Sequence, residues 1–250
     1  FSFFTVGIWW ALFSLPLLTL VHEPRAVSMG LGRMAAEGMA QLWGTFREIR
    51  HLKVIMVFLL AYWLYIDGVG TIIVMAVDYG LSLGFEQKDL ILALLMVQFT
   101  GFPCAIGFGR LAGYTGTKPA ILIALGVYLF VTLWGAFIES RHEFYIMALL
   151  IGMVQGGVQA LSRSLYARII PADKSAEFFG FYNVIGKFAT IMGPVLVAAT
   201  VLVARAWGAG PDLAPRISIS SIAVLFLAGG ALLLFVDEKK GLSERIFLEH

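Results

Sequence analysis

The chain has 250 residues, of which 60% are hydrophobic and 14% are charged, with a formal net charge of +2 and a mean hydropathy of +0.87. These values exclude an ordinary water-soluble domain and are typical of helical membrane proteins. Long uninterrupted apolar runs also exclude a transmembrane β-barrel, whose strands alternate apolar and polar residues. A single cysteine, Cys104, excludes an internal disulfide.

Seven blocks of mostly apolar residues predict seven transmembrane helices, because about 20 residues rising 1.5 Å each cross a hydrocarbon core of about 30 Å. The first block has neither a basic leader nor a small-residue cleavage site, so it is interpreted as a span and not as a signal peptide. The blocks are Phe1–Val21, Val54–Val77, Leu90–Gly109, Pro119–Ile138, Phe144–Tyr166, Phe178–Val203 and Ile217–Val236.

The lysines and arginines predict the orientation of these spans. Thirteen of the 18 basic residues fall in the stretches after the first, third, fifth and seventh blocks, which share one side of the membrane. Four lie on the other side, and Lys187 lies within a span. Because basic loops stay in the cytoplasm, we expect the N-terminus outside and the C-terminus inside, in a multi-pass protein of a bacterial inner membrane.

The chain is expected to be organised as one helix, a linker, a six-helix bundle and a tail. The linker contains apolar residues at helical spacing, which predicts an amphipathic helix on the cytoplasmic membrane surface. That helix serves either to join two bundles or to dock a partner. The apolar residues are Met39, Leu42, Trp43, Phe46 and Ile49. The expected segments are 1–21, 22–53, 54–240 and 241–250, the last ending in the tag-like residues Leu248-Glu249-His250.

Polarity divides the spans into two groups. The fourth (Pro119–Ile138) and seventh (Ile217–Val236) have almost no strongly polar side chain and can face lipid. The second, third, fifth and sixth contain acidic, amide or basic groups, and we expect them to surround an interior. This pattern predicts a six-helix unit with a central cavity, preceded by one further helix.

Asp67 is the most informative residue, because an ionisable group at membrane depth is costly and is usually functional. Trp63, Asp67 and Thr71 share one face of the second span at i, i+4 spacing, and Gly68 and Gly70 loosen the helix beside the carboxylate. Asp67 is therefore a candidate for proton uptake or for binding a cationic substrate group. The alternative is a structural carboxylate tied to a neighbouring helix.

At 1.5 Å per residue, Lys187 lies about 12–13 Å from the cytoplasmic end of the sixth span. By the same count, Asp67 lies about 20 Å from the cytoplasmic end of the second span. Lys187 either snorkels to the cytoplasmic surface or pairs with Asp67. A kink is expected at Gly193-Pro194. The polar face of this span consists of Asn183, Lys187, Thr190 and Pro194.

Glutamines mark the fifth span, where Gln155, Gln159 and Ser162 share a face, and Gln98 is a weaker signal of the same kind in the third. These amides either bind a polar substrate or hydrogen-bond to neighbouring helices. Gly152 and Gly156 permit close approach of another helix.

The sequence contains no arrangement typical of an enzyme. The spans contain no histidine, and there is neither a G-x-S-x-G motif nor a phosphate loop. We therefore expect no catalytic residue, cofactor, metal or nucleic acid. The expected partners are the lipid bilayer and a small polar solute.

The loop Gly109–Lys118 resembles the G-x-L-a-D-r-x-G-r-k motif of the major facilitator superfamily, which it matches at Gly109, Leu111, Ala112, Gly116 and Lys118. It departs from that motif where the acidic residue and the following arginine would stand, at Gly113 and Tyr114. The stretches around Asp67-Gly68, Gln155–Ser164 and Phe178–Asn183 are similar to the vacuole-effluxer-like branch, whose eukaryotic relatives export amino acids from the vacuole.

This resemblance implies that the first block is helix six of a twelve-helix transporter and that the next six blocks form its C-terminal half. The second and fifth spans would line the cavity, and the fourth and seventh would be peripheral. Transport would proceed by rocking of two halves around a midplane site, with the N-terminal half missing from this chain.

Three hypotheses remain open at this point. The first is half of a secondary transporter for a small polar solute such as an amino acid, proton-coupled through Asp67. The second is a seven-helix receptor or photoreceptor, although Ile217–Val236 has no lysine for retinal. The third is a membrane scaffold that docks partners through its linker helix.

Overall fold

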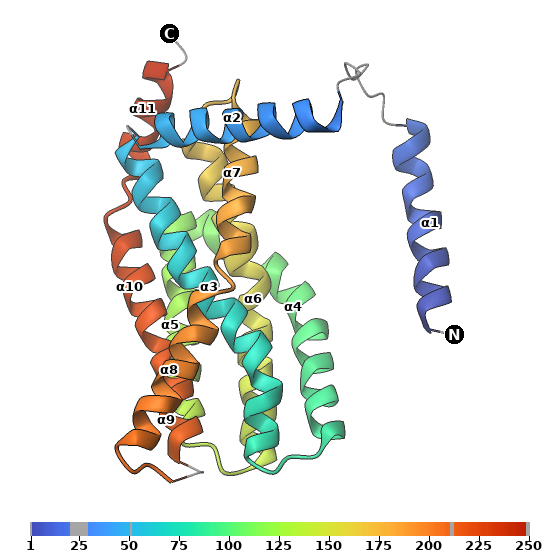
Figure 1. The fold of residues 1–250 in the computed structure, drawn as a ribbon, viewed down its shortest axis with the longest axis vertical. Coiled ribbons are helices and arrows are strands. Elements are labelled where there is room, and N and C mark those ends of the chain that lie inside the picture. Colours follow the sequence, from blue (N-terminus) through green and yellow to red (C-terminus); the bar gives the residue numbers. More distant parts are fainter. Residues whose placement is uncertain (1, 21–29, 51, 211–212, 249–250) are drawn as a thin grey trace. The chain divides into compact units, whose positions relative to one another are not determined.

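A computed structural model describes residues 2–20, 30–50, 52–210 and 213–248. The described residues form eleven helices and contain no strand, and seven helical stretches are long and apolar enough to cross a membrane. The prediction of an all-α membrane protein with seven transmembrane helices is confirmed. Figure 1 shows the order of the helices.

The chain divides into two compact units, residues 1–40 and 41–250, and each is described by itself. The first contains α1 (Ser2–Leu20), which includes Pro16, and the beginning of α2 (Leu31–Ile49). The second contains the end of α2 and a bundle. Its helices are α3 (Lys53–Ser82), α4 (Gln87–Thr115), α5 (Thr117–Gly135), α6 (Arg141–Ile169), α7 (Ser175–Phe188), α8 (Met192–Ala206), α9 (Leu213–Ser221), α10 (Ala223–Leu234) and α11 (Glu238–Leu248).

Local sequence signals account for several of these boundaries. At the start of α6, the Ser140 hydroxyl accepts from the Glu143 N–H, and the Glu143 carboxylate accepts from the Ser140 N–H at 3.0 Å. This reciprocal capping box satisfies amides that the first helical turn leaves unpaired. At the start of α5, Gly116 has a φ of 93°, which favours glycine and allows the tight turn from α4.

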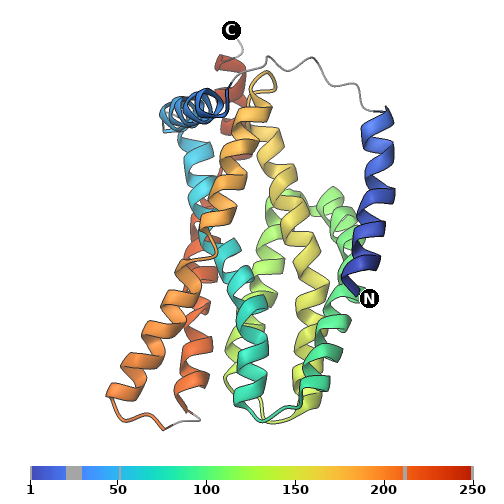
Figure 2. The same cartoon turned by 45° about the vertical axis from the view of Figure 1, so that its right-hand side comes forward.

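The sixth predicted span is broken into α7 and α8 by residues 189–191 (Figure 2). The break lies immediately before Gly193-Pro194, so the predicted kink is confirmed. Pro194 is the third residue of α8, where its missing N–H disrupts no helical hydrogen bond. The seventh span is also interrupted, at Ile222 between α9 and α10.

Glycines bring α4 and α6 into direct backbone contact. A Cβ built on Gly152 would lie 2.8 Å from the Val97 carbonyl oxygen, and one on Gly156 would lie 3.2 Å from the Gly101 carbonyl oxygen. Neither position leaves room for a side chain. The close approach predicted from these two glycines is therefore confirmed, with α4 as the partner.

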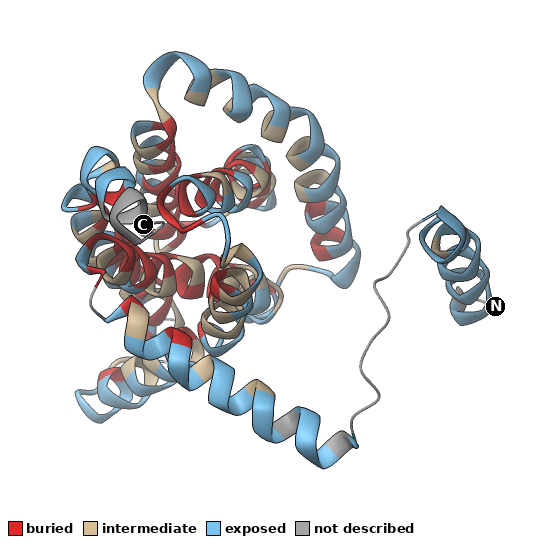
Figure 3. Ribbon diagram, turned by 90° about the horizontal axis from the view of Figure 1, so that it is seen from above, coloured by how far each residue is buried: buried red, intermediate tan, exposed pale blue. Residues whose placement is uncertain are grey.

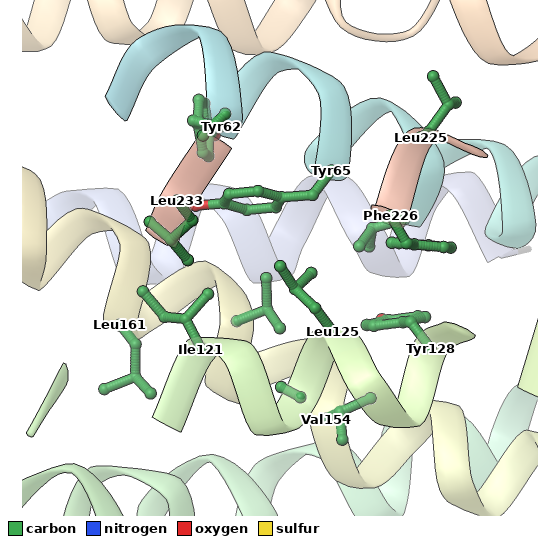
Figure 4. Packing of buried hydrophobic residues seen from close by; sticks show 14 of the residues in the cluster. Tyr62, Tyr65, Ile121, Leu125, Tyr128, Val154, Leu161, Leu225, Phe226 and Leu233 are labelled. Atoms are coloured by element: carbon green, nitrogen blue, oxygen red, sulfur yellow. The ribbon is translucent and has the colours of Figure 1, made fainter. Parts of the chain in front are cut away.

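Burial does not follow the polarity of the spans. The interiors of α5 and α10 are well covered, as Leu125, Tyr128, Phe226 and Leu233 show in Figure 4. By contrast, α4, α7 and α8 bury few of their described residues. Seen from above in Figure 3, buried residues gather where the bundle helices face one another. Each of α5 and α10 also has an exposed apolar face that can meet lipid, which includes Phe130 on α5 and Leu227 on α10.

The linker and the tail both contain helices. In α2, Ile49 is fully buried whereas Trp43 is 61% exposed. In α11, Gly241 packs so tightly that a Cβ would lie 2.8 Å from the Ile169 side chain. The predicted tail therefore begins as a packed helix, while residues 22–29 and 51 of the predicted linker and 249–250 of the tail lie outside the described residues. We call the end of the bundle that carries α2, α11 and the start of α7 the linker end.

Candidate functional site

Asp67 lies in the interior of the bundle, with no exposed surface. Neither of its carboxylate oxygens has a hydrogen-bond partner. One turn further along α3, the Thr71 hydroxyl donates to the Asp67 backbone carbonyl at 2.7 Å, so this hydroxyl is directed to the backbone and not to the carboxylate. A buried polar group without a partner is costly, and in native proteins such a group usually has a specific reason.

The break in the sixth span lies against Asp67. A Cβ on Gly193 would lie 2.8 Å from the Thr71 Cβ, and one on Gly70 would lie 4.0 Å from the Thr190 Cγ2. The Gly193 backbone N–H faces the Asp67 carboxylate without completing a hydrogen bond. The carboxylate thus lies beside the N-terminus of α8, whose dipole favours negative charge. We call Asp67, Gly70, Thr71, Thr190 and Gly193 the break site.

Trp63 lies on the same face of α3, in contact with α7. It lines an apolar groove of about 350 Å³ between α2, α3 and α7, and its Nε1 has no hydrogen-bond partner. The polar face of α3 is therefore covered by the two halves of the broken span, and Asp67 does not line an open crevice. The groove residues are Phe46, Met56, Leu59, Leu60, Trp63, Phe181, Ile185 and Phe188.

Lys187 meets the break site through its backbone, whose carbonyl accepts from the Thr190 hydroxyl at 2.9 Å. Its side chain is exposed, and neither carboxylate oxygen of Asp67 has a hydrogen-bond partner. The arrangement in which Lys187 pairs with Asp67 is therefore not present.

The amide residues predicted for the site lie on the bundle surface or only partly inside it. Gln98 on α4, Gln159 on α6 and Asn183 on α7 are exposed. Gln155 is half-buried, and its Oε1 is enclosed without a partner. Helix α6 lies between α4 and α7 (Figures 1 and 2), so these amides occupy three neighbouring helices. The structure does not bring them together with Asp67.

Four tyrosines that sequence reasoning did not single out join α3, α6 and α7, and we call them the tyrosine cluster: Tyr62, Tyr65, Tyr166 and Tyr182. Tyr62 and Tyr182 stack with ring centroids 4.2 Å apart, and Tyr166 and Tyr182 with centroids 5.0 Å apart. The Tyr65 hydroxyl lies 2.7 Å from the Ser162 hydroxyl. Tyr62 and Tyr65 lie about one turn apart on α3, but spacing within one helix could not indicate their partners on α6 and α7.

Polar contacts at the linker end join α2 to the start of α7. The Lys174 ammonium lies 2.7 Å from a Glu48 carboxylate oxygen, and the Gln41 amide donates to the Glu177 carboxylate at 2.9 Å. The hydrogen bond that Lys174 donates to Glu48 raises the pKa of Lys174 above its usual value. More than 120 residues separate each pair, so no local pattern could have indicated them.

Lys118, at the end of the predicted loop motif, has a clear structural role. Its ammonium donates to the carbonyl oxygens of Leu234 at 2.7 Å and Val236 at 2.8 Å, at the C-terminal end of α10. A cation there satisfies carbonyls without helical partners and complements the negative end of the helix dipole.

Comparison with known proteins places this bundle in a family. Residues 1–245 match the family model described as vacuole effluxer Atg22 like. The chain is 37% identical to an uncharacterized MFS-type transporter, YxiO, of Bacillus subtilis over 95% of this chain and 54% of that protein. It is 25% identical to autophagy-related protein 22 of Yarrowia lipolytica, over 98% of this chain and 45% of that protein. The chain spans about half the length of these relatives, and it belongs to the vacuole effluxer Atg22-like family of MFS-type proteins.

Proposed function

We propose that this chain is the C-terminal half of a secondary transporter that moves a small polar solute by alternating access, with Asp67 as its proton-binding group. The observation that carries the proposal is the enclosed, unpartnered Asp67 carboxylate beside a broken transmembrane helix. Ionisable residues inside membranes mark proton and ion pathways, and broken helices mark transporter sites.

A proton suits this site because the site is closely packed. The Gly193 backbone lies against Thr71, and Gly68 lies against the Phe226 ring, so the helices on both sides of Asp67 are in contact with α3. A proton needs no volume of its own and removes the cost of holding an unpartnered negative charge in the interior.

Exposed polar residues support a second half of the transporter. Gln98, Gln159, Asn183 and Lys187 are exposed on helices that are long and apolar enough to span a membrane. Such groups are unfavourable against lipid and usually face a bundle interior or a water-filled cavity. We propose that they form one wall of a cavity whose other wall belongs to the N-terminal half.

Two further features of the transporter are its class of solute and its orientation in the membrane. The resemblance to the vacuole-effluxer-like branch, whose eukaryotic relatives export amino acids from the vacuole, makes an amino acid the first solute to test. We propose that the linker end lies in the cytoplasm and the N-terminus of this chain outside, which the excess of basic residues on one side supports.

The test uses the complete transporter reconstituted in liposomes. Asp67→Asn is expected to abolish the pH dependence of solute flux, because an amide cannot exchange a proton. Asp78→Asn, on the same helix but exposed, is the matched control and should leave that dependence unchanged. Unaltered flux and pH dependence in Asp67→Asn would exclude the coupling role.

A scaffold function is the second candidate, and the exposed apolar side chains of α2 favour it. Met39 is 68% and Trp43 is 61% exposed, and both would be available to a partner at the membrane surface. Partners captured by the wild-type protein but lost from a Met39→Ser/Trp43→Ser variant with normal transport would support this second function.

A further inference from the structure

We infer that α7 is a separately moving half-helix and that Glu48 and Lys174 are positioning residues that hold it over Asp67. The inference rests on the proposed function, since it assigns to α7 the control of access to the proposed proton site.

One end of α7 is a hinge. The helix ends at Phe188, and residues 189–191 separate it from α8, which stays packed on Thr71 through Gly193. A helix interrupted by three residues can change direction there without breaking its internal hydrogen bonds. The hinge lies beside Asp67, so a change in direction of α7 alters the cover of the carboxylate.

The surface along α7 allows such a motion. Only Phe178 and Tyr182 are buried among its 14 residues. Its contacts with the bundle are ring faces and edges, in which Tyr182 stacks on Tyr62 and Tyr166, and a hydrogen bond of 3.0 Å that the Tyr166 hydroxyl donates to the Phe178 carbonyl. Ring contacts tolerate offsets and tilts, so a tilt of α7 costs this one hydrogen bond in its first turn.

The other end of α7 is held by polar contacts to α2. Lys174 precedes the helix and pairs with Glu48, and Glu177 in the first turn accepts from Gln41. The end of α2 is a fixed support, because Ile49 beside Glu48 is fully buried. Both charged side chains of the pair are 40% exposed, so the contact is weak enough to open.

In this arrangement α7 pivots about residues 189–191 and is held at its other end by two polar contacts. We call these contacts, Glu48–Lys174 and Gln41–Glu177, the latch. At 1.5 Å per residue, α7 is about 20 Å long, so a small rotation at the hinge moves its linker end by several ångströms. The groove lined by Trp63, Phe181 and Ile185 lies between α3 and α7 and widens as α7 tilts away. Opening the latch therefore opens a path from the linker end toward Asp67.

The test measures access to Asp67 directly, by labelling with a hydrophobic carbodiimide, which reacts with protonated carboxyl groups. It uses the complete transporter and reads the modified peptide by mass spectrometry, with Asp67→Asn as the control for the labelled position. Glu48→Lys and Lys174→Glu should each raise the labelling rate about threefold to fivefold, because each variant loses one exposed ion pair and such a pair stabilises the closed arrangement by about that factor. The charge-swapped double variant should return to within about twofold of wild type.

A second measurement does not depend on weakening the structure. In a Cys104→Ser background, Glu48→Cys and Lys174→Cys joined by a short bis-maleimide should slow labelling relative to the same variant left unjoined. Equal labelling of all these proteins contradicts the latch and leaves the proton site standing. Labelling of Asp67 in none of them at any pH contradicts both the latch and the proposed coupling role.

Discussion

Two helix pairs in this bundle are built on glycine in different ways. Between α4 and α6, Gly152 and Gly156 face backbone carbonyl oxygens of the partner helix. Between α8 and α3, Gly193 faces the side chain of Thr71, next to a break in the span and next to Asp67. The first contact joins two continuous helices along their length. The second contact holds one end of a half-helix, so a change in one side chain can alter it.

The largest effect is expected where a side chain would meet a backbone. In Gly152→Val the new Cβ would lie 2.8 Å from the Val97 carbonyl oxygen, which cannot move without displacing α4. We expect a loss of about 3 kcal/mol or more of unfolding free energy, at the upper end of overpacking costs. Unfolding in mixed detergent micelles measures it.

Gly126→Ala on α5 is the control for that prediction. Nothing lies within 4 Å of the added methyl group, and alanine favours a helix by about 0.5–1 kcal/mol over glycine. The control should therefore be neutral or stabilising. A Gly152→Val protein as stable as wild type would show that α4 and α6 are not in tight contact.

At the second contact the expected effect is smaller and can be rescued. Gly193→Ala would bring a Cβ into overlap with the Thr71 hydroxyl oxygen, and we expect a loss of about 2 kcal/mol. Thr71→Ala removes that oxygen, so the double variant should recover at least 1 kcal/mol in a double-mutant cycle. Additive losses would contradict the close contact between α8 and α3.

The sequence predicted those features of the fold that depend on local pattern. The seven spans follow from run length, the break follows from Gly193-Pro194, and the close approach of α6 follows from Gly152 and Gly156. Each of these signals lies within a single helix, and its physical cause acts over one or two turns.

Contacts between helices were not predictable in the same way. Polarity suggested that the fourth and seventh spans can face lipid, but it did not indicate that the other face of α5 and of α10 is well covered in the bundle. Lipid and protein interior are both apolar, so an apolar helix face has no composition that distinguishes the two surroundings. For the same reason the pattern around Asp67 indicated a polar face on α3, but not that α7 and α8 cover it.

The smallest expected effect tests how α3 is joined to α6. The Ser162 hydroxyl donates to the Val158 carbonyl at 2.6 Å, so the Tyr65 hydroxyl is the donor in the bond to Ser162. Tyr65→Phe loses one buried hydrogen bond, and we expect a cost of about 1 kcal/mol. Tyr128→Phe is the matched comparison, because the Tyr128 hydroxyl is buried without a partner and its removal should be neutral or stabilising.

Both variants keep the aromatic ring, so ring packing cancels in the comparison. A Tyr65→Phe protein as stable as Tyr128→Phe would mean that the hydroxyl pair adds nothing to the contact between α3 and α6. A measured difference of about 1 kcal/mol would instead place a directional bond between these two helices. The contact of α3 with α7 would then differ from it in kind, since α7 meets α3 chiefly through the stacked rings of Tyr182 and Tyr62.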